Sequence, residues 1–90
     1  MEIKHLKIDQ KYFKDIVNGL KTFELRLNDR DFHVGDILCL EEYKNEYTGN
    51  YIHIEVIYML EDERYLQKNY VALGIKNRLD LNANLNSTYL

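Results

Sequence analysis

Apolar and polar residues alternate along several segments of this 90-residue chain, as they do in β-strands with one buried and one solvated face. The first segment spans residues 3–8, and the second spans residues 21–27. In the second segment we expect Glu24 and Arg26 to lie on the solvated face. The buried face is then formed by Phe23, Leu25 and Leu27.

The residues between these two segments follow a helical period. Apolar side chains recur along one side: Tyr12, Phe13, Ile16, Val17 and Leu20. Asp9 is a good N-cap, because its carboxylate can accept hydrogen bonds from the free amides of the first turn. Gly19 can take the left-handed conformation that ends many helices. A short helix is therefore expected directly after the first strand.

Three further segments have strand character. Residues 37–43 begin with a run that is apolar on both faces, which indicates a central or covered strand. Residues 44–50 are expected to form a hairpin loop, with Gly49 supplying a left-handed backbone angle. The next strand has the longest alternation in the chain, formed by Ile52, Ile54, Val56, Tyr58 and Leu60. Residues 70–75 provide the closing strand.

Five strands joined by short turns, with one helix after the first strand, predict a mixed α+β, mainly β fold, in the form of a small closed or nearly closed barrel. Ninety residues leave room for one domain, and a composition of 46% hydrophobic and 30% charged residues is that of a globular protein. We assign the domain to residues 1–76. Residues 77–90 are rich in asparagine and are expected to be a tail or a loosely docked extension.

Composition excludes several classes of protein. No apolar run approaches the roughly 20 residues of a membrane span, and the N-terminus lacks a secretion pattern, so we expect a cytoplasmic protein without a membrane partner. Cys39 is the one cysteine and lies in an apolar run, which favours a buried hydrophobic role over a catalytic nucleophile. The three histidines His5, His33 and His53 lack the paired spacing of zinc sites, so neither a metal nor a cofactor is expected.

The net charge of −3 is unevenly distributed. Residues 1–30 carry seven Lys/Arg against five Asp/Glu, residues 31–63 carry one against nine, and residues 64–90 carry four against one. The acidic middle disfavours a long duplex footprint, and a short single strand or a single nucleotide fits better. Its surface over residues 41–63 is also the face that a protein-interaction module would use.

The densest cluster of candidate chemistry follows the predicted helix, where the sequence reads Gly-x-Lys-x-x-Glu-x-Arg from Gly19 onward. Lys21 as a point charge and Arg26 as a bidentate donor can bind a phosphate or carboxylate. Glu24 can accept from a base edge, a ribose hydroxyl or an amine. We expect Asn28 and Arg30 at the rim of the same cleft. The alternative is a surface ion network worth roughly 0–1 kcal/mol per pair.

This motif, followed by Val34-Gly35-Asp36, resembles the hallmark of the ASCH domain, a branch of the PUA-like superfamily. Over roughly residues 3–76 the chain is similar to a small bacterial and phage-associated subgroup of that superfamily. The resemblance implies a PUA-like barrel with a cleft beside the helix, a fold used for RNA and modified nucleotides. It therefore implies binding of short single-stranded RNA or a nucleotide-like small molecule.

The resemblance also implies an enzymatic alternative. Some ASCH proteins resemble amidohydrolases that deacetylate N4-acetylcytidine with a lysine, a threonine and a distant glutamate. Lys21 matches the lysine, whereas Glu24 stands at the threonine's position and Thr22 is displaced from it. The distant glutamate has three candidates: Glu55, Glu61 and Glu63. If chemistry occurs here, Lys21 or Glu24 is the expected general base.

Six of the eight tyrosines fall into two predicted groups. Three of them surround the predicted hairpin loop and can stack unpaired bases: Tyr43, Tyr47 and Tyr51. Three others are expected to fill the barrel: Tyr12, Tyr58 and Tyr70. The sequence does not indicate the oligomeric state of the chain.

Overall fold

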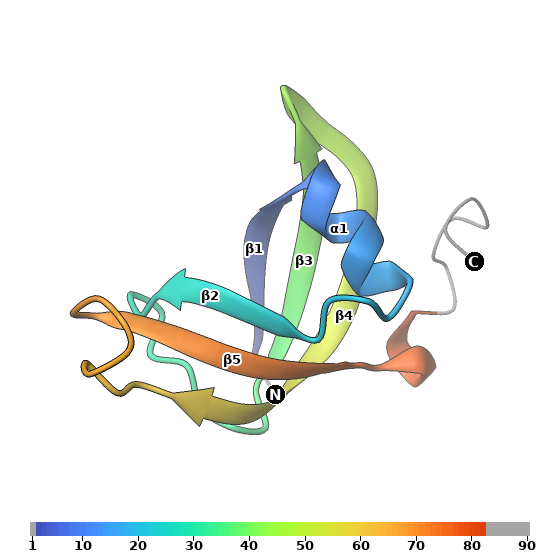
Figure 1. The fold of residues 1–90 in the computed structure, drawn as a ribbon. Coiled ribbons are helices and arrows are strands. Elements are labelled where there is room, and N and C mark those ends of the chain that lie inside the picture. The colour runs from blue at the N-terminus through green and yellow to red at the C-terminus, as the bar shows by residue number, and fades with distance from the viewer. Residues whose placement is uncertain (1, 83–90) are drawn as a thin grey trace.

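The structure is a computed structural model in which residues 2–82 are described; residues 83–90 of the predicted extension lie outside the described residues. Five strands and one α-helix follow in the predicted order, with the helix directly after the first strand (Figure 1). The elements are β1 (Ile3–Asp9), α1 (Gln10–Val17), β2 (Phe23–Leu27), β3 (Ile37–Lys44), β4 (Glu46–Leu60), β5 (Tyr70–Asn77) and the short 3-10 helix η1 (Leu79–Leu81).

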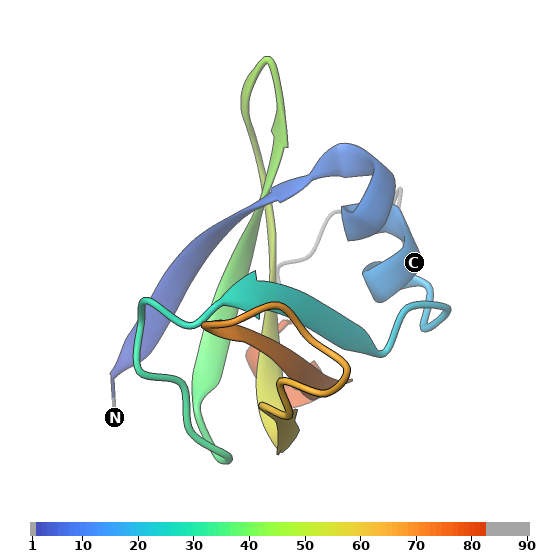
Figure 2. The ribbon, with the colours of Figure 1, turned by 60° about the vertical axis from the view of Figure 1, so that its left-hand side comes forward.

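All five strands belong to one sheet with the order β1-β3-β4-β5-β2. β1 pairs with β3 in parallel, and the other neighbouring pairs are antiparallel. The sheet is strongly curled, with β2 and β5 crossing the direction of β1 and β3 (Figures 1 and 2). It forms a half-barrel whose two edge strands are β1 and β2, so the predicted mainly β barrel-like architecture with one helix is confirmed.

The helix has the predicted ends but a narrower buried face. Asp9 accepts a hydrogen bond from the Lys11 N–H at 2.8 Å, and Gly19 has φ +76°. Phe13 and Ile16 are buried, whereas Tyr12 is 43% exposed. The prediction that Tyr12 fills the barrel is wrong. The helix has eight residues and lies at the rim of a small sheet, so only part of one side of the helix packs against the sheet.

The β3–β4 hairpin differs from its predicted form. Asn45, with φ +65°, is the sole residue between the two strands, and β4 continues through the region predicted to be loop. Glu42 explains this extension. Its carboxylate is 1% exposed and accepts hydrogen bonds from Thr48 Oγ1 at 2.6 Å and Asn50 Nδ2 at 3.1 Å, which tie the start of β4 to β3.

A β-bulge reverses the phase of β4 partway along its length. Ile52, Ile54 and Val56 are buried as predicted. The pairing with β5 then shifts between Val56 and Tyr58, so that Tyr58 is 66% exposed. The extra residue of a bulge moves every later side chain to the opposite face. Tyr58 is therefore not a barrel filler, and Tyr70, 38% exposed on β5, is not one either.

The largest difference from the predicted arrangement is in β2, where the two faces are exchanged. Glu24 is 5% exposed and Arg26 is half-buried. The apolar residues on the opposite face are about half-exposed: Phe23 at 54%, Leu25 at 53% and Leu27 at 45%. The alternation correctly predicted a strand, but the polar face points inward.

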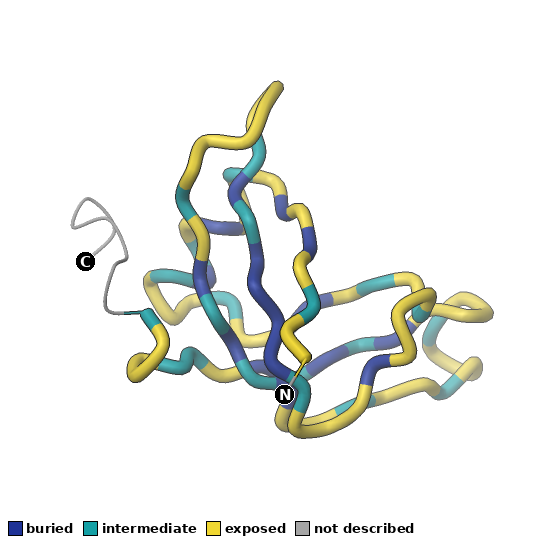
Figure 3. Tube along the Cα trace, turned by 180° about the vertical axis from the view of Figure 1, so that it is seen from behind, coloured by how far each residue is buried: buried dark blue, intermediate teal, exposed yellow. Residues whose placement is uncertain are grey.

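The core lies inside the curl of the sheet and under α1. Buried positions follow the middle of the strands, and the hairpin tip and the loop after β4 are exposed (Figure 3). Cys39 is buried on β3 as predicted, and burial, aided by the charge of Glu41, raises the pKa of its thiol to about 11. Within residues 2–82, none of the helices has the length and apolar character that crossing a membrane requires.

The described part of the C-terminal extension is bonded to β4. Arg78 forms ion pairs with Glu55 and Asp80. The Asn82 side chain accepts from the His53 N–H at 2.7 Å and donates to the His53 carbonyl at 2.9 Å. A side-chain amide thus pairs with both backbone groups of His53 as a neighbouring strand residue would.

Candidate functional site

The candidate site lies at the open seam of the half-barrel, between β1 and β2. The Arg26 Nη2 on β2 donates to the Lys7 carbonyl on β1 at 2.7 Å. Further along, the Arg30 Nη2 donates to the His5 carbonyl at 3.2 Å. Two arginine side chains therefore bond to the free edge of β1, where a neighbouring strand would otherwise pair.

A buried carboxylate stands at the centre of this seam. Glu24 Oε1 accepts from Lys21 Nζ at 2.6 Å, and Glu24 Oε2 accepts from Arg26 Nε at 2.7 Å. The Lys21 ammonium also donates to the Phe23 carbonyl at 2.7 Å. Both cations have most of their side-chain surface covered, at 14% and 24% exposed. The three charges form one hydrogen-bonded unit, which differs from the exposed ion network that the sequence left as an alternative.

A cavity of about 590 Å³, which we call the β1–β2 cleft, surrounds this unit. Its lining comes from β1, the first turn of α1 and β2: Lys7, Ile8, Asp9, Tyr12, Lys21, Phe23, Glu24, Leu25, Arg26 and Leu27. Three cations and two carboxylates give the lining a formal excess of one positive charge. Lys21 Nζ lies 4.9 Å from the ring centroid of Phe23 and 5.5 Å from that of Tyr12, within cation–π range of both.

Backbone contacts on both sides position Lys21 at the mouth of the cleft. The Lys21 N–H donates to the Asp15 carbonyl at 3.0 Å, directly after the left-handed turn at Gly19. The carbonyl of Thr22 accepts from the Ile75 N–H at 3.0 Å, which attaches the start of β2 to β5. The end of the helix and the neighbouring strand together direct the lysine side chain toward Glu24.

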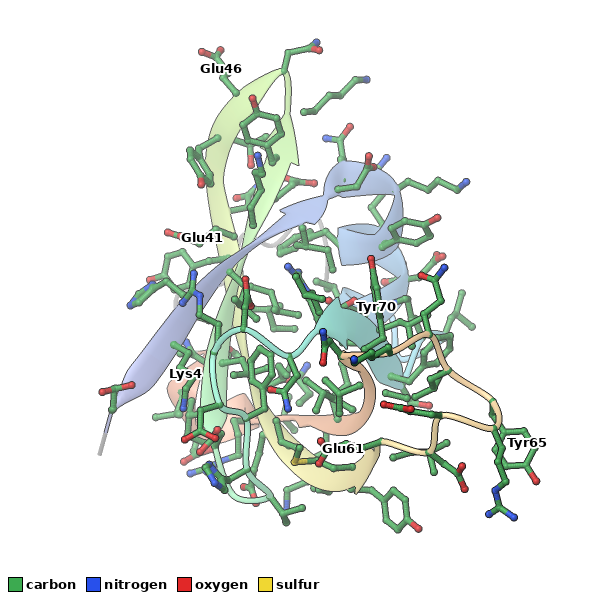
Figure 4. All side chains as sticks on the ribbon, turned by 90° about the vertical axis from the view of Figure 1, so that its left-hand side faces the viewer. Lys4, Glu41, Glu46, Glu61, Tyr65 and Tyr70 are labelled. Carbon is green, nitrogen blue, oxygen red and sulfur yellow. The ribbon has the colours of Figure 1, made fainter. Side chains whose placement is uncertain are left out.

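The five residues predicted for the site separate into two groups. Lys21, Glu24 and Arg26 are brought together in the cleft. Arg30 contacts β1 beyond the cleft lining. Asn28 faces a different neighbour: its Nδ2 lies 3.4 Å from an oxygen of Glu61. Glu61 directly follows β4 (Figure 4).

Sequence reasoning missed seven residues that line the cleft, of which the polar ones are Lys7, Asp9 and Tyr12. The sequence patterns indicate other roles for two of these, Asp9 as a helix cap and Tyr12 as a core residue. Their place in the cleft follows from the curl of the sheet, which brings β1 opposite β2 although the two strands are not paired. No spacing along the chain carries that information.

The tyrosines of the hairpin lie outside the cleft lining. The rings of Tyr43 and Tyr47 make an edge-to-face contact at 5.3 Å, and Lys7 Nζ lies 4.4 Å from the Tyr43 centroid. Tyr51 makes a similar contact with His53 at 5.5 Å. A second cavity of about 690 Å³ between α1 and the hairpin is lined by Asp9, Gln10, Lys11, Lys14, Tyr43, Lys44 and Asn45. It shares Asp9 with the β1–β2 cleft.

The residues considered for amidohydrolase chemistry do not meet at Lys21. Thr22 is exposed and does not line the β1–β2 cleft. Glu55 is paired with Arg78, and Glu61 and Glu63 lie on the connection after β4, outside that lining. Among residues 2–82 there is also no group of three or more His, Cys, Asp or Glu residues arranged to hold a metal ion.

Comparison with protein families gives one finding. Residues 3–75 match a family described as "Domain of unknown function (DUF3850)", which covers every strand except the last two residues of β5. A search of curated proteins finds no match to this chain.

Proposed function

The chain belongs to the DUF3850 family, and from the geometry of the β1–β2 cleft we propose that it binds short single-stranded RNA or a nucleotide-like ligand there. The observation that carries this proposal is the buried Glu24 carboxylate, fixed between Lys21 and Arg26 in a cavity beside two aromatic rings. The volume of the β1–β2 cleft, about 590 Å³, is within the range of small-ligand pockets.

The polar groups of the cleft match the parts of a nucleotide. Each Glu24 oxygen accepts one protein hydrogen bond and retains capacity for a second, so it can accept an N–H from a base edge. Lys21 has a third ammonium hydrogen beyond the two bonds described here, and it can donate to a phosphate or ribose oxygen. The ion unit thus offers both an acceptor and a donor within one small space.

Aromatic surface at the mouth of the cleft supports the same ligand class. Tyr12 is 43% exposed and Phe23 is 54% exposed, and both line the cavity. Stacking of an unpaired base on such rings contributes about 1–3 kcal/mol. The excess of one positive charge is small, which suits one or two phosphates better than the backbone of a long duplex.

The contacts of Lys21 favour binding over amidohydrolysis. Its ammonium donates to Glu24 and to the Phe23 carbonyl, and these two bonds hold it in place as a hydrogen-bond donor. Residues 22, 55, 61 and 63 lie outside the lining. On Gly19, Lys21, Glu24 and Arg26 we further propose that the domain is of the ASCH type within the PUA-like superfamily. We also propose that it acts in the cytoplasm.

The proposal is tested by fluorescence anisotropy with a short labelled single-stranded RNA at two salt concentrations. We expect the Lys21→Ala/Arg26→Ala variant to bind at least about tenfold more weakly than the wild type. The slope of log affinity against log salt should fall by about 0.7 for each phosphate that the variant no longer binds. Competition with unlabelled mononucleotides then distinguishes an RNA site from a single-nucleotide site.

The matched control is Lys68→Ala, which removes one positive charge from the exposed loop before β5. It should leave the affinity within about twofold of the wild type, because Lys68 does not line the cleft and a single exposed charge is largely screened. Equal weakening by the control and the double variant would mean that binding is non-specific. If neither RNA nor a mononucleotide binds the wild type, the proposed function is wrong.

A further inference from the structure

The outer surface of the half-barrel carries a continuous apolar face over three strands. Cross-strand pairing places Phe23, Gly74 and Tyr58 in one row and Leu25, Ala72 and Leu60 in the next. Leu27 and Tyr70 form a third row. We call these eight residues the outer apolar face. None of them is charged, and the six large ones are between 38% and 66% exposed.

We propose that the outer apolar face is an interface with a second copy of this chain, forming a two-fold symmetric dimer. The strand phase supports this assignment. β2 directs Glu24 inward and three large apolar residues outward, although burying one such side chain stabilises a protein by about 1.5–3 kcal/mol. An interface on the outer side covers those residues and, because Phe23, Leu25 and Leu27 also line the β1–β2 cleft, it borders that cleft.

The relief of the face fits a copy of itself. Phe23, Leu25 and Leu27 on β2 form a ridge, and Ala72 and Gly74 on β5 form the adjacent groove. Gly74 has no side chain and packs closely against its neighbour, because a Cβ added there would lie 3.1 Å from the Tyr58 Cβ. A two-fold axis between β2 and β5 places the ridge of each copy in the groove of the other, which is what a self-complementary interface requires.

Area and charge also favour a second copy over other partners. Three of the six large residues are aromatic and three are leucines; aromatic side chains bury about 150–250 Å² each, so six large residues near half exposure present on the order of 500 Å². With a polar rim this approaches the roughly 800 Å² per partner of a stable complex. An uncharged face causes no repulsion between two copies of a chain with a net charge of −3. It offers no cation to an RNA phosphate.

The test is sedimentation velocity over a wide range of protein concentration for the wild type, Tyr58→Glu and Tyr47→Glu. The two tyrosines lie on the same strand with similar exposure, 66% and 59%, but only Tyr58 belongs to the outer apolar face. We expect a concentration-dependent dimer for the wild type and Tyr47→Glu. Tyr58→Glu should raise the dissociation constant about thirtyfold or more, because it places a charge inside the interface.

Two checks keep the result interpretable. Circular dichroism confirms that each variant is folded, and Tyr58→Ser removes the ring without adding a charge should the glutamate variant not fold. Tyr58 does not line the β1–β2 cleft, so RNA affinity can be measured in the same samples. A wild type that is monomeric throughout overturns the proposal, as does a dimer that persists in both Tyr58 variants. A monomer whose RNA affinity falls in Tyr58→Ser assigns the face to nucleic acid and also overturns it.

Discussion

β2 and the middle of β4 have the same sequence pattern and opposite burial. In β4 the apolar residues Ile52, Ile54 and Val56 are fully buried. In β2 the apolar residues are half-exposed and Glu24 is buried. The comparison teaches that alternation identifies a strand and its two faces, but the position of the strand in the sheet decides which face points inward.

The two strands differ in what lies on their inner side. β4 is flanked by β3 and β5 and faces the closed part of the core. β2 is an edge strand whose inner side meets the β1–β2 cleft. A carboxylate can be buried there because Lys21 and Arg26 each donate a hydrogen bond to one of its oxygens, which offsets the cost of removing it from water.

The largest expected effect on stability comes from truncating one apolar residue in β4 and, for comparison, one in β2. Ile54→Ala should lower the free energy of unfolding by about 2–4 kcal/mol, because it leaves a cavity at a fully buried position. Leu25→Ala should cost less than about 1 kcal/mol, since the leucine is 53% exposed. Urea unfolding at low protein concentration measures both values. Equal losses would contradict the reversed burial of β2.

A smaller effect is expected from the inward polar face of β2. Glu24→Ala leaves Lys21 and Arg26 without their shared acceptor and should cost about 1–3 kcal/mol; partial access to water keeps it below the cost of a fully buried charge. Glu63→Ala, an exposed glutamate, is the matched control and should cost under about 0.5 kcal/mol. If urea unfolding gives the two variants the same stability, the ion unit does not support the inward orientation.

The smallest effect on stability is expected from the ion pair between Lys4 and Asp36, which serves as a reference for the ion unit of Lys21, Glu24 and Arg26. Burial alone raises the pKa of Asp36, but the hydrogen bond from the His33 N–H and the ion pair with Lys4 outweigh it, so the pKa lies below its ordinary value of 3.8. The stability that Asp36 gains from these contacts is therefore present above about pH 4 and lost as the pH falls. Lys4→Met should cost roughly 0.5–1 kcal/mol at neutral pH.

That difference between Lys4→Met and the wild type should shrink as the pH falls from neutral through the lowered pKa of Asp36 into strong acid, where the carboxyl is protonated in both proteins. Chemical denaturation at neutral pH and in strong acid is the measurement. A penalty of the same size at both would show that Lys4 acts through packing of its aliphatic stem rather than through its charge.

Local signals predicted most of the fold. The cap at Asp9, the left-handed Gly19 and the strand periods indicated the element order, and the apolar run of β3 indicated its burial. The predictions that failed, the phase of β4 and the orientation of β2, depended on tertiary context. The bulge after Val56 adds one residue to β4 without a change in composition, and the curl of the sheet decides which way β2 faces.

The candidate site was also predicted only in part, and again the local signals succeeded. Lys21, Glu24 and Arg26 were found because they lie within one short segment, where spacing is informative. The contributions of Lys7, Asp9 and Tyr12 come from elements that meet β2 only after the sheet has curled. Asn28 followed the motif along the chain, but the turn after β2 directs its side chain toward Glu61.

The arginine contacts across the seam also bear on solubility. An unpaired strand edge is a template on which another unfolded or misfolded chain can add a strand. Arg26 and Arg30 occupy two carbonyls along that edge of β1 and place bulky charges beside them. The same side chains that border the cleft therefore protect the chain against aggregation, and their replacement is expected to shorten the time for which a concentrated solution stays clear.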